Sequence, residues 1–336
     1  MISYKYSIVI SALGFILNLI VNGVFLYLTI FKIKKMHGTY KRMVITFTVL
    51  GTIFSAWEII AEPFAHNFKN SLLYFSCNTW LGSKTWLRYM LAMWSGCHTL
   101  IIWFIAMQFI YRLVCLIDTN NIKKLEGIYG YLMIIVPFVI GGFFAVMVET
   151  LIAKDKMLDD NLRKLIFENY QLLISELPKY NITPYNLDGS VNWGNFGLLV
   201  IAVFLNSLGY LVILYCGVQM HLNMKKELAK LSISNQDLQR QFFKALIAQS
   251  IGPTIFLVLP MGPFLLSPLI PGLNINWQSG WIFCLVGAYS PFDTIMFMMI
   301  VSEYRTLLKN RVGYTVSAAT PDYRTQDPAT TGVQTN

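Results

Sequence analysis

An uncharged run near the start of the chain decides the class of fold. Residues 6–31 read YSIVISALGFILNLIVNGVFLYLTIF and contain no Asp, Glu, Lys or Arg. A helix needs about 20 apolar residues to cross a bilayer, so this segment is long enough to span a membrane. Because it lacks the small-residue cleavage site of a secretory signal peptide, we expect it to remain as the first span of the protein.

Similar uncharged runs recur along the chain. One of them, residues 245–292, is too long for a single span, and a turn signal at residues 268–276 divides it in two. The sequence therefore predicts seven spans, at about residues 6–31, 43–62, 87–114, 127–149, 194–220, 244–269 and 279–301. We expect residues 1–312 to form an all-α membrane bundle and residues 313–336, rich in Thr, Ser, Pro, Gln and Asp, to form a disordered cytoplasmic tail.

The composition of the 336 residues agrees with a membrane protein. Hydrophobic residues make up 55% of the chain, charged residues make up 13%, and the mean hydropathy is +0.54. Soluble domains carry about 25% charged residues, so this composition excludes both an ordinary soluble enzyme and a disordered chain. The net charge of +9 leaves two explanations, which are basic loops beside the spans or a nucleic-acid partner.

The positions of the basic residues decide between these explanations. With the N-terminus outside, 17 of the 26 Lys and Arg residues fall in cytoplasmic segments and nine fall outside, together with nine acidic residues. An excess of basic residues inside is typical of membrane proteins, and it excludes a nucleic-acid partner here. Seven spans with the N-terminus outside are the layout of a G-protein-coupled receptor. The sequon that begins at Asn181 then lies in the second outer loop, and Asn181 is a candidate for glycosylation.

Four stretches of the sequence resemble the nematode serpentine receptor class r (Str) chemoreceptors. They are HGTYKRM at residues 37–43, QFIYR at 108–112, LQRQFFKAL at 238–246, and YSPFD at 289–293 followed by SEYR at 302–305. The chain departs from the family pattern at Leu113 and Thr294, and its second outer loop has no Cys that could pair with Cys77.

This resemblance implies a chemosensory receptor with no catalytic activity. Such a receptor binds a small molecule from outside and activates a heterotrimeric G protein, and it requires neither a cofactor nor a metal. The resemblance also implies a multi-pass protein of the plasma membrane, located in the sensory cilium, with membrane lipid as a further partner.

The resemblance places a conformational switch at the inner ends of the third, sixth and seventh spans. The switch residues that it implies are Tyr111, Arg112, Pro253, Tyr289 and Asp293. Each has a simpler interpretation as well, because an Arg at a helix end can reach the interface and a proline can form a static kink. Asp293 is the only charge deep in a span, so it should face a polar partner inside the bundle, and Asn18 and Asn22 are candidates.

Basic residues on the cytoplasmic side are the candidate contacts of the G protein. They are Arg112, Lys225, Lys226, Arg240, Lys244 and Arg305. Acidic lipid would suit the same charges, so the assignment to a protein partner depends on the resemblance.

The ligand should bind in the outer third of the bundle. His98 lies 14 residues before Arg112, which is about 21 Å along a helix. The candidate ligand-binding residues at this depth are Glu58, Met90, Met93, Trp94, His98, Phe256 and Trp281. Aromatic and Met side chains there can equally serve packing, and pockets of this kind suit a small, apolar or weakly polar molecule.

Other functions fit the sequence less well. The chain has no catalytic motif, its four His residues lie at different heights in the bundle, and its seventh span has no Lys for a retinal Schiff base. A seven-span transporter or ligand-gated channel is the alternative, although internal repeats and a polar-lined helix are not evident.

Overall fold

A computed structural model provides the three-dimensional description of the chain. It describes residues 4–33, 36, 38–117, 125, 127–152, 160–186, 188–228, 236, 240–241, 244–245, 247, 250–273, 275–278 and 280–311. The predicted tail, residues 313–336, lies outside the described residues.

Within this described part, seven helical segments are long and apolar enough to cross a membrane, which confirms the predicted seven-helix bundle. They are α1 (Tyr4–Tyr27) continued by η1 (Leu28–Lys32), α2 (Gly38–Ala61), α3 (Lys84–Ile117), α5 (Ile128–Leu151), α7 (Trp193–Leu228), the segment Ser250–Leu269, and α10 (Gly280–Ile300). The sixth segment contains η3 (Thr254–Val258), α9 (Leu259–Leu266) and η4 (Ser267–Leu269). A shorter helix, α11 (Ser302–Arg311), follows the last span.

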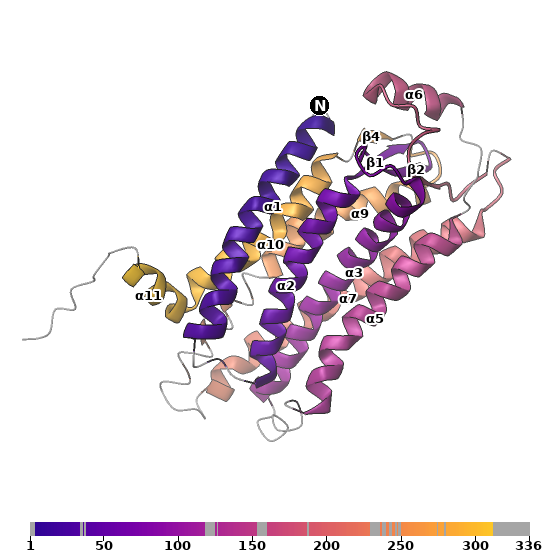
Figure 1. Ribbon diagram of the computed structural model, residues 1–336. Helices are drawn as coiled ribbons and strands as arrows, with labels where there is room; N and C mark the ends of the chain where they lie inside the picture. Colours follow the sequence, from indigo (N-terminus) through magenta and orange to yellow (C-terminus); the bar gives the residue numbers. More distant parts are fainter. Residues whose placement is uncertain are drawn as a thin grey trace, which may run out of the picture.

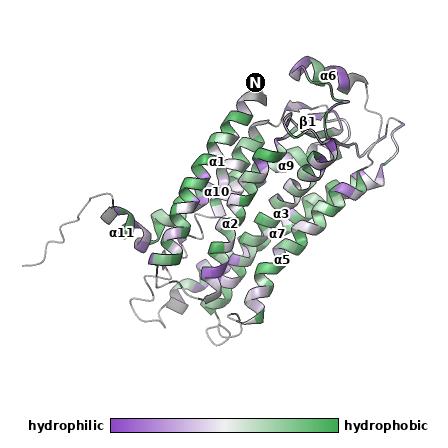
Figure 2. Ribbon diagram, in the orientation of Figure 1, coloured by the Kyte–Doolittle hydropathy of each residue, from purple (hydrophilic) through white to green (hydrophobic). Residues whose placement is uncertain are grey.

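The helices run side by side, and α3 lies at the centre of the bundle (Figure 1). It packs against α2, α5 and α7, while α1 packs against α2 and α10. The helices α3 and α5 approach each other closely, because a Cβ atom on Gly141 would lie 2.7 Å from the carbonyl oxygen of Gly96. Small residues let membrane helices approach in this way. Hydrophobic residues cover the bundle along its length (Figure 2), as expected for a surface in contact with lipid.

One end of the bundle carries a small antiparallel sheet, which the sequence analysis did not predict. Its strands are β1 (Pro63–Phe68), β2 (Ser71–Ser76), β3 (Lys179–Ile182) and β4 (Asn276–Gln278), in the order β3-β2-β1-β4. The helix α6 (Asp160–Tyr170) lies over this sheet (Figure 1). The fold is therefore mostly helical but not all-α.

The sheet escaped prediction because its two long strands are buried almost throughout. Five of the six residues in each of β1 and β2 are buried, so neither strand shows the alternation of apolar and polar residues that marks a half-exposed strand. The hairpin turns at Lys69 and Asn70, and Lys69 adopts a positive φ of 52°. Tyr74 pairs with Ala65 on one side and with Tyr180 on the other.

The second span begins earlier than the sequence predicted. α2 begins at Gly38, whereas the predicted span began at residue 43. Lys41 and Arg42 therefore lie in the helix itself, and Arg42 donates a 2.6 Å hydrogen bond to the hydroxyl of Tyr131 in α5. Charged residues at a helix end can reach the interface, which is why the uncharged run was shorter than the helix.

Candidate functional site

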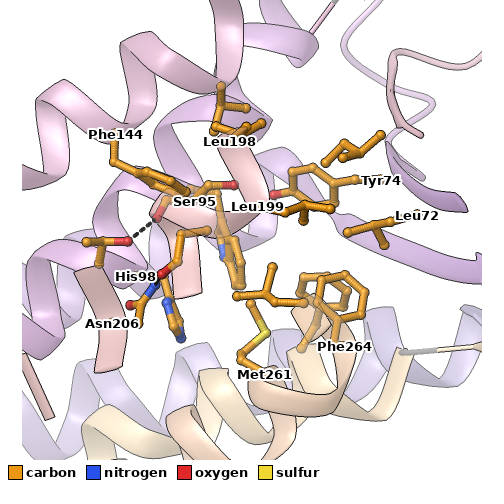
Figure 3. A pocket seen from close by; sticks show the side chains of 17 residues that line it. Leu72, Tyr74, Ser95, His98, Phe144, Leu198, Leu199, Asn206, Met261 and Phe264 are labelled. Carbon is orange, nitrogen blue, oxygen red and sulfur yellow. Dashed lines mark hydrogen bonds between the residues drawn. The ribbon is translucent and has the colours of Figure 1, made fainter. Parts of the chain in front are cut away.

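A cavity lies between the helices directly beneath the sheet; we call it the outer cavity (Figure 3). Its walls come from α3, α5, α7, α9 and α10. Its roof comes from Leu72 and Tyr74 of β2 and from Ile182 of β3. Most of the lining is apolar, including Phe144, Leu198 and Met261.

Three buried polar atoms in this lining stand out. They are Trp94 Nε1, His98 Nε2 and Asn206 Oδ1, which are buried and have no hydrogen-bond partner among the described residues. The indole nitrogen donates, the amide oxygen accepts, and the imidazole nitrogen does either according to its tautomer. A buried polar atom without a partner costs about 1–3 kcal/mol, so a ligand that supplied partners here would recover part of that cost. Figure 3 shows His98 and Asn206 close together on one side of the cavity.

Aromatic rings fix the position of Trp94 on α3. Its indole stacks on His98 with the ring centres 6.0 Å apart, and it contacts Phe54 at 5.5 Å and Phe283 at 5.0 Å. Aromatic pairs at these separations add about 0.5–1.5 kcal/mol each to the burial of their area. The cavity wall at this point is therefore held by α2, α3 and α10 together.

Two charged residues tie the roof of the cavity to α3 and α5. The sequence analysis counted both among the charges on the outer side of the membrane but did not predict that they meet. Arg88 of α3 pairs with Glu149 of α5 at 3.3 Å, and its guanidinium lies 4.6 Å from the ring centre of Tyr180. The Tyr180 hydroxyl donates to Glu149, and burial raises the pKa of this phenol. A sequence signal for this contact existed, since both charges lie just inside the outer ends of predicted spans.

A second tie joins the sheet to the end of the sixth span. Asn67 of β1 is fully buried and donates a 2.9 Å hydrogen bond to the carbonyl of Phe264, and it also contacts the hydroxyl of Ser267. Phe264 lines the outer cavity. The roof and the sixth span are thus coupled at the cavity wall.

A second opening, the side cavity, adjoins the outer cavity between α7 and the sixth span. His98, Asn206, Met261 and Leu265 line both spaces. Leu266, on the wall of the side cavity, is 42% exposed on the surface of the bundle.

Only part of the predicted ligand-binding set gathers at the outer cavity. Trp94 and His98 line it. Met93 is 42% exposed, because it lies one residue, and hence about 100°, around α3 from Trp94. Phe256 packs on Phe292 with the ring centres 5.0 Å apart.

The remaining members of that set lie elsewhere. The backbone carbonyl of Met90 accepts a 2.9 Å hydrogen bond from Trp57. Glu58 lines a different cavity, between α1, α2 and α10. The side chain of Trp281 lies outside the described residues.

The predicted switch residues at the inner end of α3 are buried. The guanidinium of Arg112 lies 3.3 Å from the ring centre of Tyr40 in α2, and Tyr111 stacks on the same ring at 6.1 Å. Arg112 is 9% exposed. Its side chain therefore packs against α2 instead of extending along the helix to the interface.

The predicted polar contact between the first, second and seventh spans exists, but different residues of the seventh span make it. Ser290 donates a 3.0 Å hydrogen bond to Asn18, and Thr294 donates one of 2.7 Å to Asn22. Asp293 is buried and accepts a 3.5 Å hydrogen bond from Tyr289. The two switch candidates of α10 thus contact each other one turn apart.

The sixth span changes its helical form at the predicted proline. Pro253 is followed immediately by the π-helical turn η3, and Pro260 and Pro263 lie in α9. The hydroxyl of Thr254 lies 2.8 Å from that of Tyr210 in α7. π-helical turns are rare in proteins, and those that occur are often found at functional sites.

Most of the predicted cytoplasmic contacts are exposed at the end of the bundle opposite the sheet. Lys226, Arg240, Lys244 and Arg305 have exposed side chains. The side chain of Lys225 lies outside the described residues. α11 is anchored by Tyr304, which stacks on Phe25 of α1 at 5.2 Å.

Two predictions for the outer loops have different outcomes. Cys77 is buried and does not form a disulfide within the described part of the chain, which agrees with the absence of Cys from the second outer loop. Asn181 lies in β3, where it pairs with Leu73 and its side-chain oxygen is buried. This position differs from the surface loop that a glycosylation site requires.

Comparison with known proteins gives concordant matches. The family model of the serpentine-type seven-transmembrane chemoreceptors Str matches residues 7–309. G-protein coupled receptor str-33 of Caenorhabditis elegans is 30% identical over 306 residues, covering 89% of this chain and 88% of that protein. Serpentine receptor class r-10 of Caenorhabditis briggsae is 23% identical over 308 residues, covering 87% of this chain and 86% of that protein. The Caenorhabditis elegans protein of the same name is 29% identical over 107 residues, covering 32% and 31% of the two chains.

Proposed function

Because the chain belongs to the Str family of serpentine seven-transmembrane G-protein-coupled chemoreceptors, we propose that its outer cavity is where it recognises its chemical signal. The protein is a multi-pass membrane receptor and not an enzyme. The ligand is a small molecule with an apolar body and one or two hydrogen-bonding groups. The observation that carries this proposal is the set of three unpartnered polar atoms, from Trp94, His98 and Asn206, in a mostly apolar cavity.

The switch at the other end of the bundle transmits occupation of the cavity to a heterotrimeric G protein. Movement of the sixth span at η3 would separate its inner end from α3, where Arg112 packs on Tyr40. Lys225, Lys226, Arg240, Lys244 and Arg305 then contact the G protein, and acidic lipid neutralises those that stay at the membrane. Asp293 and Tyr289 support the conformation of the seventh span. The receptor acts at the plasma membrane, in a sensory cilium.

The experiment that tests this proposal is a calcium assay in cells that express the receptor with a promiscuous G protein. A panel of volatile compounds and small metabolites is applied, and surface expression of each variant is measured. Ala202 is buried in the cavity wall, so Ala202→Phe should fill the space and abolish the response. Val200 lies two residues away on the same helix and is 42% exposed, so Val200→Phe is the matched control and should respond as the wild type does.

The same assay tests the switch. Arg112→Ala should reach the cell surface, still bind ligand, and lose G-protein output. An undiminished response in Ala202→Phe would place the ligand outside this cavity. Unchanged signalling by Arg112→Ala would remove that residue from the switch, and a current that persisted without G protein would favour a channel.

A further inference from the structure

We propose a second ligand site, for a small protonated amine, in the cavity between the outer parts of α1, α2 and α10. We call this space the acidic cavity. Of its described lining residues, only Phe283 also lines the outer cavity. The proposal is independent of the function assigned to the outer cavity, because it depends on other residues.

Glu58 is the centre of this site. It lies within a membrane span and is 3% exposed. One carboxylate oxygen, Oε1, accepts a 2.9 Å hydrogen bond from the hydroxyl of Ser11, whereas Oε2 is buried and has no hydrogen-bond partner among the residues that the structure describes. An acidic side chain inside a span is costly unless it is paired, and it marks a functional site by default. Oε2 is therefore a vacant acceptor on the cavity wall.

The lining of the acidic cavity specifies the charge of its occupant. Besides Glu58 it contains a second carboxylate, Glu62, the hydroxyls of Ser7 and Ser11, and the thiol of Cys77. Among the described lining residues there is no Lys, Arg or His. Two acids without a basic residue attract a cation, and an ammonium group supplies the donors that Oε2 lacks.

The remaining lining favours an organic amine over a metal ion. No three His, Cys, Asp or Glu side chains of the described residues are close enough to hold a metal. Ile8, Ile59, Pro63, Phe64 and Phe283 form apolar walls around the acids. These walls suit a hydrocarbon or aromatic group attached to the ammonium, and the rings of Phe64 and Phe283 can face the cation.

The helix contacts explain how an occupant of this site would act on the receptor. A Cβ atom on Gly287 of α10 would lie only 2.8 Å from Glu58 Oε1, so the glycine is what lets α10 approach the carboxylate. Ser55, three residues before Glu58 in α2, and Ser290, three residues after Gly287 in α10, belong to the hydrogen-bond network of Asn18. The hydrogen-bond network joins α1, α2 and α10. An amine bound to Glu58 therefore contacts the same three helices, on the outer side of this network.

Binding to the purified full-length receptor in detergent tests the proposal. Phenethylamine and isoamylamine are compared with 2-phenylethanol and isoamyl alcohol, which match them in shape but carry no charge. Each compound is titrated while the thermal unfolding midpoint is followed. The amines should raise the midpoint saturably and the alcohols should not. Glu58→Gln keeps the size of the side chain and should weaken amine binding by about tenfold or more, since a charge-assisted hydrogen bond is lost.

Three further variants make the result specific. Glu176 is an exposed acid of the second outer loop, so Glu176→Gln is the matched control and should bind amines as the wild type does. Gly287→Ala keeps the carboxylate but crowds it, and it should also weaken amine binding. Ala202→Phe fills only the outer cavity and should leave amine binding unchanged, which separates this site from the one proposed above.

Any of three results would overturn the proposal. They are equal shifts from amines and alcohols, unaltered amine affinity in Glu58→Gln, and the absence of a shift from either amine up to its limit of solubility. If Glu58→Gln does not fold, the comparison of amines with alcohols on the wild type and on Gly287→Ala decides the question.

Discussion

At the scale of single residues, two asparagines of the first helix hold three spans together. Asn18 and Asn22 are 0% and 1% exposed. The amide of Asn22 donates 2.9 Å and 3.2 Å hydrogen bonds to the hydroxyls of Thr52 and Ser290, and its carbonyl accepts the hydrogen bond from Thr294. One side chain therefore satisfies groups on α2 and α10 at once.

Replacing Asn22 should destabilise the bundle. Asn22→Ala leaves several buried hydroxyls short of a partner, and we expect a loss of about 1–3 kcal/mol in the free energy of unfolding. Thermal or denaturant unfolding of the purified receptor in detergent measures this loss. Asn169 of α6 is exposed, and its amide bonds only the carbonyl of Leu165, so Asn169→Ala is the control and should change stability little. Equal stability of the two variants would mean that the network is dispensable.

The sequence predicts how deep a residue lies in a span, but it does not predict which way the side chain points. For this reason only some of the predicted ligand-binding residues line the outer cavity. Counting residues from Arg112 placed Trp94 and His98 at the right height, and both line the outer cavity. It could not place Met93, because α3 is apolar on all sides and the sequence gives no sign of which face points inward. Glu58 was predicted from its depth as well, and the structure places it in a separate cavity, because its neighbours come from α1 and α10.

At the scale of elements, the sheet is the part that sequence reasoning could not reach. The strand β1 pairs with β4, and β2 pairs with β3, across separations of more than 100 residues. These pairings depend on the bundle bringing three outer segments together, whereas each span is predicted by its own apolar run. Burial of β1 beneath α6 removed the remaining signal.

The sheet should weaken in acid because of His66. This residue of β1 is buried, and its ring nitrogens lie 2.7 Å from the Tyr170 hydroxyl and 2.8 Å from the Asn276 amide oxygen. Burial lowers the pKa of His66, and the bond to Asn276 offsets part of that effect. The unfolded sheet therefore binds the proton more tightly than the folded one. The contribution of His66 to stability is complete above the ordinary histidine pKa of about 6.5 and is lost as the pH falls below it.

Hydrogen exchange of β1 and β4 at about pH 7.5 and about pH 5.5 measures this effect across the ordinary histidine pKa. After correction for intrinsic rates, protection should be lower at the acidic pH in the wild type and nearly independent of pH in His66→Gln. Equal protection of the wild type at both pH values would show that His66 does not control the sheet.

At the scale of the whole molecule, the two ends of the bundle differ in their charged residues, as the distribution of basic residues along the sequence predicted. The sheet end pairs Arg88 with Glu149, while Lys226, Arg240, Lys244 and Arg305 are exposed at the other end. The spans themselves were predictable, because a bilayer accepts only closed hydrogen-bonding elements of a set length. The cavities were not, because they are formed by side chains from several helices.

The orientation of the chain is a prediction that tags can test. A tag before Met1 should stain on intact cells, and a tag after Asn336 should stain only after permeabilisation, since basic residues collect on the cytoplasmic side. A cytoplasmic marker protein that remains unstained on the intact cells is the control. The reverse staining pattern would mean that the N-terminus and the sheet lie on the cytoplasmic side of the membrane.

The side cavity has a consequence for how chemical stimuli should be compared. Leu72, Tyr74 and Ile182 of the sheet roof the outer cavity, while the side cavity reaches His98 between α7 and the sixth span, next to the exposed Leu266. A molecule that enters by this route is drawn from the hydrocarbon phase, so the effective dose is its aqueous concentration multiplied by its partition coefficient. Each added methylene is worth about 0.8 kcal/mol of partitioning, or roughly fourfold in local concentration, before the molecule touches the protein. Potencies within a homologous series would then rise with chain length even if the contacts in the cavity were equal.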